Sequence, residues 1–232
     1  MRIRKLLMPT VALSAALMLA PASHAAVLVG HDLSGLFAGL PGNGGTALFW
    51  TFQGNWNKAI GVEIAPGDGY SFESLTAVLQ LDAGPGAVGS EQVWARIHAD
   101  QSGHPGALWA TLDTAQVTAA TYAFTPITFT APLPVTLLGG QRYWFVLGDN
   151  TLDSGPDLRW AVTESRAAPA NGAASLLGYR LSTDGGTNWS SSSSFNAVSI
   201  LANPVPEPQA VILLLAGLGI VLSVARRRRH GS

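Results

Sequence analysis

Short apolar runs separated by glycine- and proline-containing turns constrain the fold of this chain more than any other feature. No segment between residues 26 and 202 keeps apolar residues at the spacing of a helix, whereas runs rich in Val, Ile, Leu and Trp recur along it. With no internal repeat, they predict one all-β domain, an antiparallel β-sandwich of jelly-roll type. Eleven runs are predicted as strands: 47–52, 59–64, 74–81, 92–98, 108–113, 127–130, 135–138, 142–147, 158–163, 176–182 and 197–201.

Two of these runs predict which side chains are buried. In the run 74–81, alternate residues from Leu75 to Leu81 share one apolar face, which we expect in the core. The run 142–147 is apolar on both faces after its first residue, as in a strand that is covered on both sides. Five tryptophans lie in predicted strands and are expected in the core: Trp50, Trp94, Trp109, Trp144 and Trp160.

Charge and cysteine content exclude several functions. Between residues 26 and 206 there are six basic and thirteen acidic residues, a balance of −7, so a nucleic-acid partner is not expected. The chain has no cysteine, which excludes disulfides, thiolate metal sites and a cysteine nucleophile. The folded domain, residues 26–202, must therefore be stabilised by its core alone.

The N-terminus has the pattern of a secretory signal peptide. Three basic residues precede an apolar stretch at residues 6–20, and small residues follow as far as Ala25. Signal peptidase is therefore expected to remove residues 1–25 by cleaving between Ala25 and Ala26. An uncleaved N-terminal anchor is the alternative.

The C-terminus contains three segments in a fixed order. Residues 203–209 are rich in proline and predict an extended linker. Residues 210–225 are apolar and predict a transmembrane helix of about 24 Å, slightly shorter than the bilayer core of about 30 Å. A plain anchor or a buried core helix are the alternatives. Residues 226–232 form a basic cytoplasmic tail, in which four arginines are expected to stop transfer: Arg226, Arg227, Arg228 and Arg229.

This order of segments closely resembles the PEP-CTERM sorting signal, with Val205, Pro206, Glu207 and Pro208 as the sorting motif. The resemblance implies a protein exported from a Gram-negative bacterium and anchored in the inner membrane by its C-terminal helix. It also implies processing by an exosortase, a membrane-embedded cysteine transpeptidase or protease, before delivery to the cell surface or extracellular matrix. The expected partners are thus signal peptidase, exosortase and the inner membrane.

The body shows two further resemblances. Residues of about 46–200 resemble the choice-of-anchor R domain, a bacterial surface domain without assigned chemistry, most clearly in Gly103-His104-Pro105-Gly106 and Gly140-Gln141-Arg142-Tyr143-Trp144. The segment 182–189, Ser-Thr-Asp-Gly-Gly-Thr-Asn-Trp, resembles a single Asp-box, with Asn188 in place of the usual threonine. The Asp-box implies that Asp184 folds the turn while Trp189 packs beneath it. A single copy argues against a propeller.

No catalytic motif is present, and we expect a non-catalytic protein. The three histidines of the body have no metal-ligand spacing, and its four glutamates are scattered. The alternative is a secreted glycan-active enzyme on a jelly-roll scaffold, in which two carboxylates would converge in a cleft. A purely structural adhesive or spacer is a third hypothesis. The residues in question are His31, His98, His104, Glu63, Glu73, Glu91 and Glu164.

Two loops suggest ligands. Trp56, flanked by Asn55 and Asn57, has the ring and amides that stack on and hydrogen-bond a sugar, so exopolysaccharide is a candidate ligand. The alternative is that Trp56 packs beneath its own turn. Asp149, Asp153 and Asp157 supply closely spaced oxygen ligands, so structural calcium is the one cofactor considered, against the alternative of turn-forming side chains.

Overall fold

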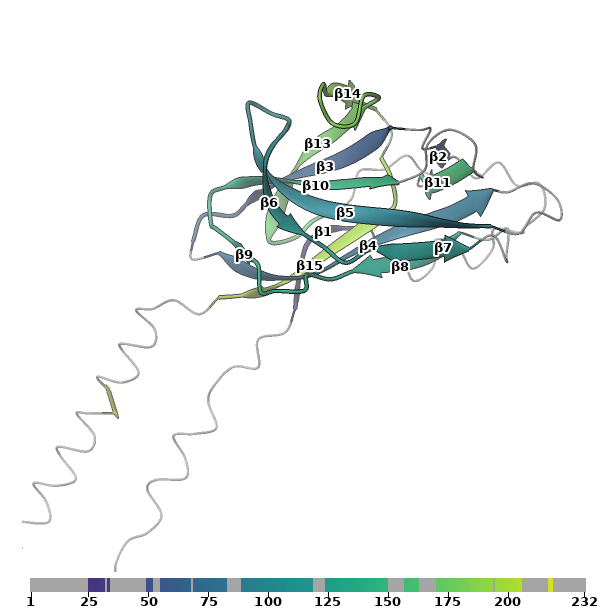
Figure 1. Ribbon diagram of the computed structural model, residues 1–232. Coiled ribbons are helices and arrows are strands. Elements are labelled where there is room, and N and C mark those ends of the chain that lie inside the picture. The colour runs from purple at the N-terminus through teal and green to yellow at the C-terminus, as the bar shows by residue number, and fades with distance from the viewer. Residues whose placement is uncertain are drawn as a thin grey trace, which may run out of the picture.

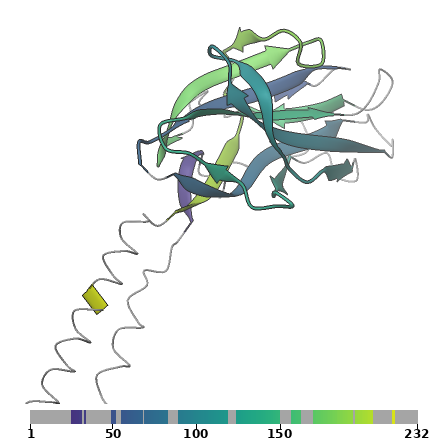
Figure 2. The same cartoon turned by 60° about the vertical axis from the view of Figure 1, so that its left-hand side comes forward.

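Two antiparallel β-sheets pack face to face as a sandwich (Figures 1 and 2). The computed structural model describes most of the sandwich and a few residues outside it. The described residues are 25–31, 33, 49–51, 55–67, 69–82, 89–118, 124–149, 157–162, 170–193, 195–205 and 217–218.

The two sheets contain eight and seven strands. The order in the eight-stranded sheet is β12 (Ala170–Asn171), β1 (Ala26–Gly30), β15 (Val198–Pro204), β4 (Tyr70–Asp82), β11 (Asp157–Ala161) and β2 (Phe49–Thr51), and β8 (Thr125–Phe129) and β9 (Thr136–Leu137) also pair with β4. The order in the seven-stranded sheet is β14 (Ser190–Ser192), β13 (Ala174–Ser182), β3 (Asn57–Ile64), β10 (Arg142–Asp149), β5 (Ser90–Asp100) and β6 (Pro105–Thr111), and β7 (Ala115–Thr118) also pairs with β5.

Each of the eleven predicted runs overlaps an observed strand, and the antiparallel all-β sandwich is confirmed. The strands β1, β7, β12 and β14 lie outside the eleven predicted runs. The strands β12 and β14 contain only two and three residues, too few for an alternation to be visible. The strand β1 contains only five residues and begins directly after the predicted cleavage site. The jelly-roll topology stays a prediction.

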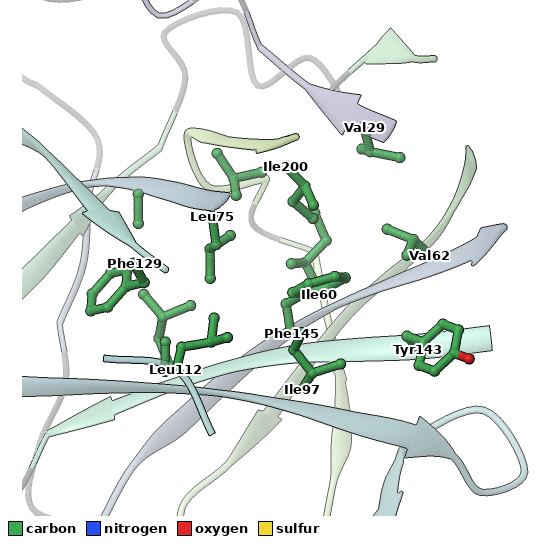
Figure 3. Close-up of a cluster of buried hydrophobic side chains, with 14 of the residues drawn as sticks. Val29, Ile60, Val62, Leu75, Ile97, Leu112, Phe129, Tyr143, Phe145 and Ile200 are labelled. Carbon is green, nitrogen blue, oxygen red and sulfur yellow. The ribbon is translucent and has the colours of Figure 1, made fainter. Parts of the chain in front are cut away.

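Alternating side chains place one face of each sheet in the main core. The predicted face of β4, from Leu75 to Leu81, lies there, and Phe145 contributes from β10. Figure 3 shows side chains of both sheets in this core, with Leu75 and Ile200 from the eight-stranded sheet and Ile60 and Phe145 from the other. Burying each large aliphatic or aromatic side chain contributes about 1.5–3 kcal/mol, which stabilises a domain that has no disulfides.

The strand β10 is buried on both faces, as predicted, but its outer face is covered by side chains and a loop. The Trp144 ring lies over Gly61 of β3, where an added Cβ would come within 2.7 Å of it. Its Nε1 donates a hydrogen bond to Asp100 Oδ1 (2.7 Å). The guanidinium of Arg180 lies over the ring at 5.2 Å and is held there because its Nε donates to the Gly103 carbonyl (2.8 Å). Trp144 is consequently fully buried.

The five strand tryptophans differ in burial. Trp144 and Trp160 are fully buried, as predicted. Trp94 is half-buried and packs against a small cluster on the outer face of the sheet, the Trp144 cluster, which consists of Ala59, Trp144 and Val146. The side chain of Trp50 lies outside the described part of the structure. Trp109 is exposed, and its environment belongs to the site described below.

The Asp-box turn has the structure that its resemblance implies. Asp184 Oδ1 accepts hydrogen bonds from the Asn188 N–H (2.9 Å), the Thr187 N–H (3.1 Å) and the Ser182 hydroxyl (2.8 Å). Asn188, the departure from the motif, adds a bond from its side-chain amide to Asp184 Oδ2 (2.6 Å). These bonds, led by that from the Asn188 backbone, lower the pKa of Asp184 to about 2. Trp189 packs against the Trp144 cluster, so the turn is joined to the sheet.

Candidate functional site: the base of the sandwich

The last strand, β15, continues two residues beyond the predicted boundary at residue 202. Pro204 pairs with Tyr70 of β4, and the Val205 N–H donates to the Gly69 carbonyl (3.2 Å). Proline is tolerated here because β1 begins opposite Ala202, so among the described residues Pro204 has a paired strand on one side only. The predicted linker therefore starts as a strand, and the Pro-Glu-Pro tripeptide follows directly after Val205.

Both ends of the folded domain lie at the same end of the sandwich, which we call the base (Figures 1 and 2). Ala26 is the first residue of β1 and pairs with Ala202, close to the end of β15. Cleavage between Ala25 and Ala26 would leave β1 complete. The cleavage itself stays a prediction, since residues 1–24 lie outside the described residues.

A pocket of about 400 Å³ opens at the base, where β3 and β5 end and β10 begins. It adjoins the point where the chain leaves the fold, since Gly69, the acceptor for Val205, lies against the backbone of Leu138 in the pocket wall. The lining comes from the strands β3, β5, β6 and β10 and from the loop before β10. It consists of Glu63, Ala99, Asp100, Trp109, Leu138, Gly140, Gln141, Arg142 and Tyr143.

Trp109 forms one wall of this pocket and is 46% exposed, so its predicted place in the core is wrong. The strand β6 is at the edge of its sheet, and its pairing with β5 shifts register next to Trp109. The indole Nε1 donates to the Thr136 carbonyl (3.2 Å), and the ring lies 5.6 Å from that of Tyr143 at 59°. These two contacts hold the ring in one orientation while much of its surface stays open.

Tyr143 packs against the Trp109 ring from the side of the main core. It is buried, and Figure 3 places its hydroxyl pointing away from the other labelled core side chains. The hydroxyl accepts a hydrogen bond from the Leu138 N–H (3.0 Å). The loop before β10 is thereby fixed to the same aromatic pair that holds Trp109.

The opposite side of the pocket is polar. Arg142 Nε donates to Glu63 Oε2 at 2.9 Å, and both side chains are about half exposed. Asp100 Oδ1 accepts from Trp144 Nε1 and from the Gly103 N–H (3.1 Å), so this carboxylate is held by two donors. Gln141 is exposed, and its side-chain amide makes no hydrogen bond within the described part of the chain. The site thus combines one fixed aromatic face with hydrogen-bonding groups that have unused capacity.

The ligand residues suggested by the sequence lie elsewhere. Trp56 is half-buried and Asn55 is exposed, with the Asn55 carbonyl accepting from the Gly185 N–H (2.8 Å). Asn57 is buried, and its amide is satisfied by the Gly186 N–H (3.2 Å) and the Trp56 carbonyl (3.1 Å). Asn55 and Asn57 therefore brace the Asp-box turn, and sugar binding at Trp56 and these two residues stays a prediction.

The suggested calcium ligands also belong to separate places. Asp149 ends β10 in one sheet, and Asp157 begins β11 in the other. Asp153 and the side chain of Asp157 lie outside the described residues. No group of three potential metal-binding side chains occurs among the residues that the structure describes, so a calcium site at these residues stays a prediction.

The histidines contact the backbone. His98 Nδ1 lies 2.8 Å from the Gly106 carbonyl, and partial burial lowers its pKa. His31 Nδ1 accepts from the Val198 N–H (3.3 Å), and His104 Nδ1 lies 3.2 Å from the Pro105 carbonyl. Within the described chain, each of the three thus has a structural partner.

The four glutamates differ in their surroundings. Glu63 lines the pocket, Glu73 accepts from Asn203 (3.3 Å), and Glu91 is buried. Glu164 lies outside the described residues. Glu63 shares the pocket with Asp100, a pair that sequence spacing could not reveal, because the sheet alone brings β3 beside the end of β5 across β10.

Comparison with protein-family models decides the nature of the C-terminal segment, since the PEP-CTERM protein-sorting motif matches residues 204–229. The segment is a PEP-CTERM protein-sorting motif. It implies an exported, membrane-anchored protein that an exosortase processes, as the sequence predicts. The match begins at Pro204, the last residue of β15. No curated protein matches the chain.

Most of the PEP-CTERM segment lies outside the described residues, including the predicted transmembrane helix apart from Gly217 and Leu218. Within the described part, no helix has the length and hydropathy needed to cross a bilayer. The span at residues 210–225 therefore stays a prediction.

Proposed function

We propose that this chain is a non-catalytic protein of the bacterial cell surface or extracellular matrix, delivered by its PEP-CTERM segment and associated with exopolysaccharide. Signal peptidase removes residues 1–25. Residues 210–225 then anchor the protein in the inner membrane of a Gram-negative cell, with Arg226 to Arg229 on the cytoplasmic side. An exosortase acts near residues 205–208, and the choice-of-anchor R-like sandwich is the part delivered.

The position of the sorting motif carries this proposal. The match starts at Pro204, and the last described hydrogen bond from the chain end to the sandwich is made by Val205. A folded domain that ends where a sorting motif begins is suited to be cargo. The processing enzyme can act on residues beyond Val205 without unpairing β15, so export and processing leave the fold intact.

A second candidate function, glycan hydrolysis, is favoured by one observation: Glu63 and Asp100 line the same pocket. Both carboxylates already have donors, Arg142 for Glu63 and Trp144 with Gly103 for Asp100. These bonds favour structural roles. Turnover of a glycan by the purified protein, abolished in Glu63→Gln and in Asp100→Asn, would overturn the non-catalytic proposal.

Transfer of the C-terminal segment to another protein tests the sorting function. Residues 204–232 are fused to an exported reporter and expressed in cells with and without an exosortase. We expect a shorter, released reporter only where the exosortase is present. The matched control carries Glu207→Ala in the same segment. Equal processing of both fusions, or release without exosortase, would contradict the proposal.

A further inference from the structure

We propose that the pocket at the base binds a neutral saccharide unit of a polysaccharide, with Trp109 as the stacking platform and Gln141 and Arg142 as hydrogen-bonding partners. This inference deepens the proposed function, on which it rests, because it takes exopolysaccharide as the polymer that an exported domain meets. Trp109 then takes the role that the sequence suggested for Trp56, which lies 53 positions earlier in the chain.

The aromatic wall supports the first part of this inference. A sugar ring presents C–H groups on its faces and hydroxyls at its edge, so it pairs with an open aromatic face. Trp109 offers such a face, since the Thr136 carbonyl satisfies its N–H and Tyr143 supports the ring. A ring already held in place loses little conformational entropy when a ligand binds.

The polar wall supports the second part. Arg142 uses Nε for Glu63, and its terminal nitrogens make no hydrogen bond in the described chain. Glu63 accepts this bond through Oε2, which leaves Oε1 for a hydroxyl. Gln141 adds an amide with both a donor and an acceptor. Converging donors and acceptors beside an apolar face are typical of sites that orient a small polar ligand.

The charges select a neutral saccharide. Glu63 and Arg142 neutralise each other, and Asp100 leaves the pocket with a surplus negative charge. The domain as a whole has a balance of −7 between residues 26 and 206. An anionic polymer would be repelled by both, and added salt would weaken that repulsion.

Affinity electrophoresis of the full-length chain tests the site. A polyoxyethylene detergent keeps the chain in solution, because detergents with sugar headgroups would compete for the pocket. The gels contain dextran, a galactomannan or anionic alginate. We expect wild type to be retarded by a neutral polymer and not by alginate, and Trp109→Ala and Gln141→Ala to lose at least about tenfold in affinity.

Trp56→Ala is the matched control, since it removes the tryptophan at which the sequence suggested sugar binding, and it should bind as wild type does. Trp109→Phe should keep part of the affinity, because it still offers an aromatic ring. The melting temperature of each variant is measured as well, since a purely structural defect would lower the melting temperature together with the affinity. Unchanged binding by Trp109→Ala, loss of binding in Trp56→Ala instead, or retardation by alginate alone would overturn the proposal. Processing of each variant in cells is followed in parallel, so that failure of the pocket is distinguished from failure of sorting.

Discussion

The folded sandwich and the PEP-CTERM segment share Pro204, yet different properties of the sequence specify them. The sandwich depends on alternation along strands and on contacts between distant residues, such as Arg142 with Glu63. The sorting segment depends on the local order of a short motif, an apolar run and arginines. Substitutions in the sandwich should therefore change stability, and substitutions in the motif should change delivery.

The largest effect on stability is expected at Trp144. Trp144→Ala should lower the free energy of unfolding by about 3–5 kcal/mol, because a fully buried indole is removed and Asp100 loses one of its two donors. Urea denaturation of the exported protein measures this. Trp109→Ala is the matched control and should cost about 1 kcal/mol or less, since much of that ring is exposed. An equal loss of unfolding free energy in the two variants would contradict the burial of Trp144 in the Trp144 cluster on the outer face of β10.

A smaller, pH-dependent effect is expected at Lys58, which is fully buried with its ammonium 5.7 Å from the centre of the Tyr179 ring. Burial lowers the pKa of Lys58 from 10.5 to about 7. Between these values the unfolded chain binds more protons than the folded chain, so the free energy of unfolding rises with pH, by up to about 1.4 kcal/mol per pH unit.

Lys58→Met should lack this rise. Denaturation at pH 7, 8 and 9 compares the two proteins, and the difference between wild type and variant should change steadily across the series. Parallel stability curves for wild type and Lys58→Met would show that Lys58 titrates in the folded protein as it does in the unfolded chain.

The smallest effect is expected at Asp184 in the exposed Asp-box turn. Its pKa is lowered to about 2 from a usual value of 3.8, so its stabilising contribution is present above pH 4 and is lost as the pH falls through 2. Asp184→Asn should therefore lower the melting temperature at pH 7 and have little effect near pH 2. A melting-temperature difference that persists unchanged to pH 2 would contradict this account of the turn.

The sequence predicts the sandwich better than the pocket, for a physical reason. Central strands such as β10 are covered on both sides, so their sequence is a continuous apolar run, and the burial of Trp144 follows from this run. Trp109 lies in an edge strand at a register shift, and its exposure depends on what the neighbouring strands leave uncovered. Apolar composition alone cannot distinguish these two tryptophans.

The polar side of the pocket could not be predicted from the sequence either. Glu63 and Arg142 are adjacent only because β3 and β10 pair in one register, across 79 positions of sequence. The sequence singled out residues 140–144 as part of a resemblance, without a role in binding. The Asp-box turn could be predicted in detail because the hydrogen bonds that Asp184 accepts all come from residues within four positions of it.

The most direct test of the account is the fate of Glu207→Ala in the native host. Its motif follows the last described hydrogen bond of β15, so the sandwich loses no described contact and should keep the stability of wild type. We expect the unprocessed protein to accumulate in the inner membrane, whereas Trp109→Ala is processed and delivered normally. Immunoblots of membrane and surface fractions measure this. Delivery of Glu207→Ala in the same amount and size as wild type would contradict the sorting function on which the account is built.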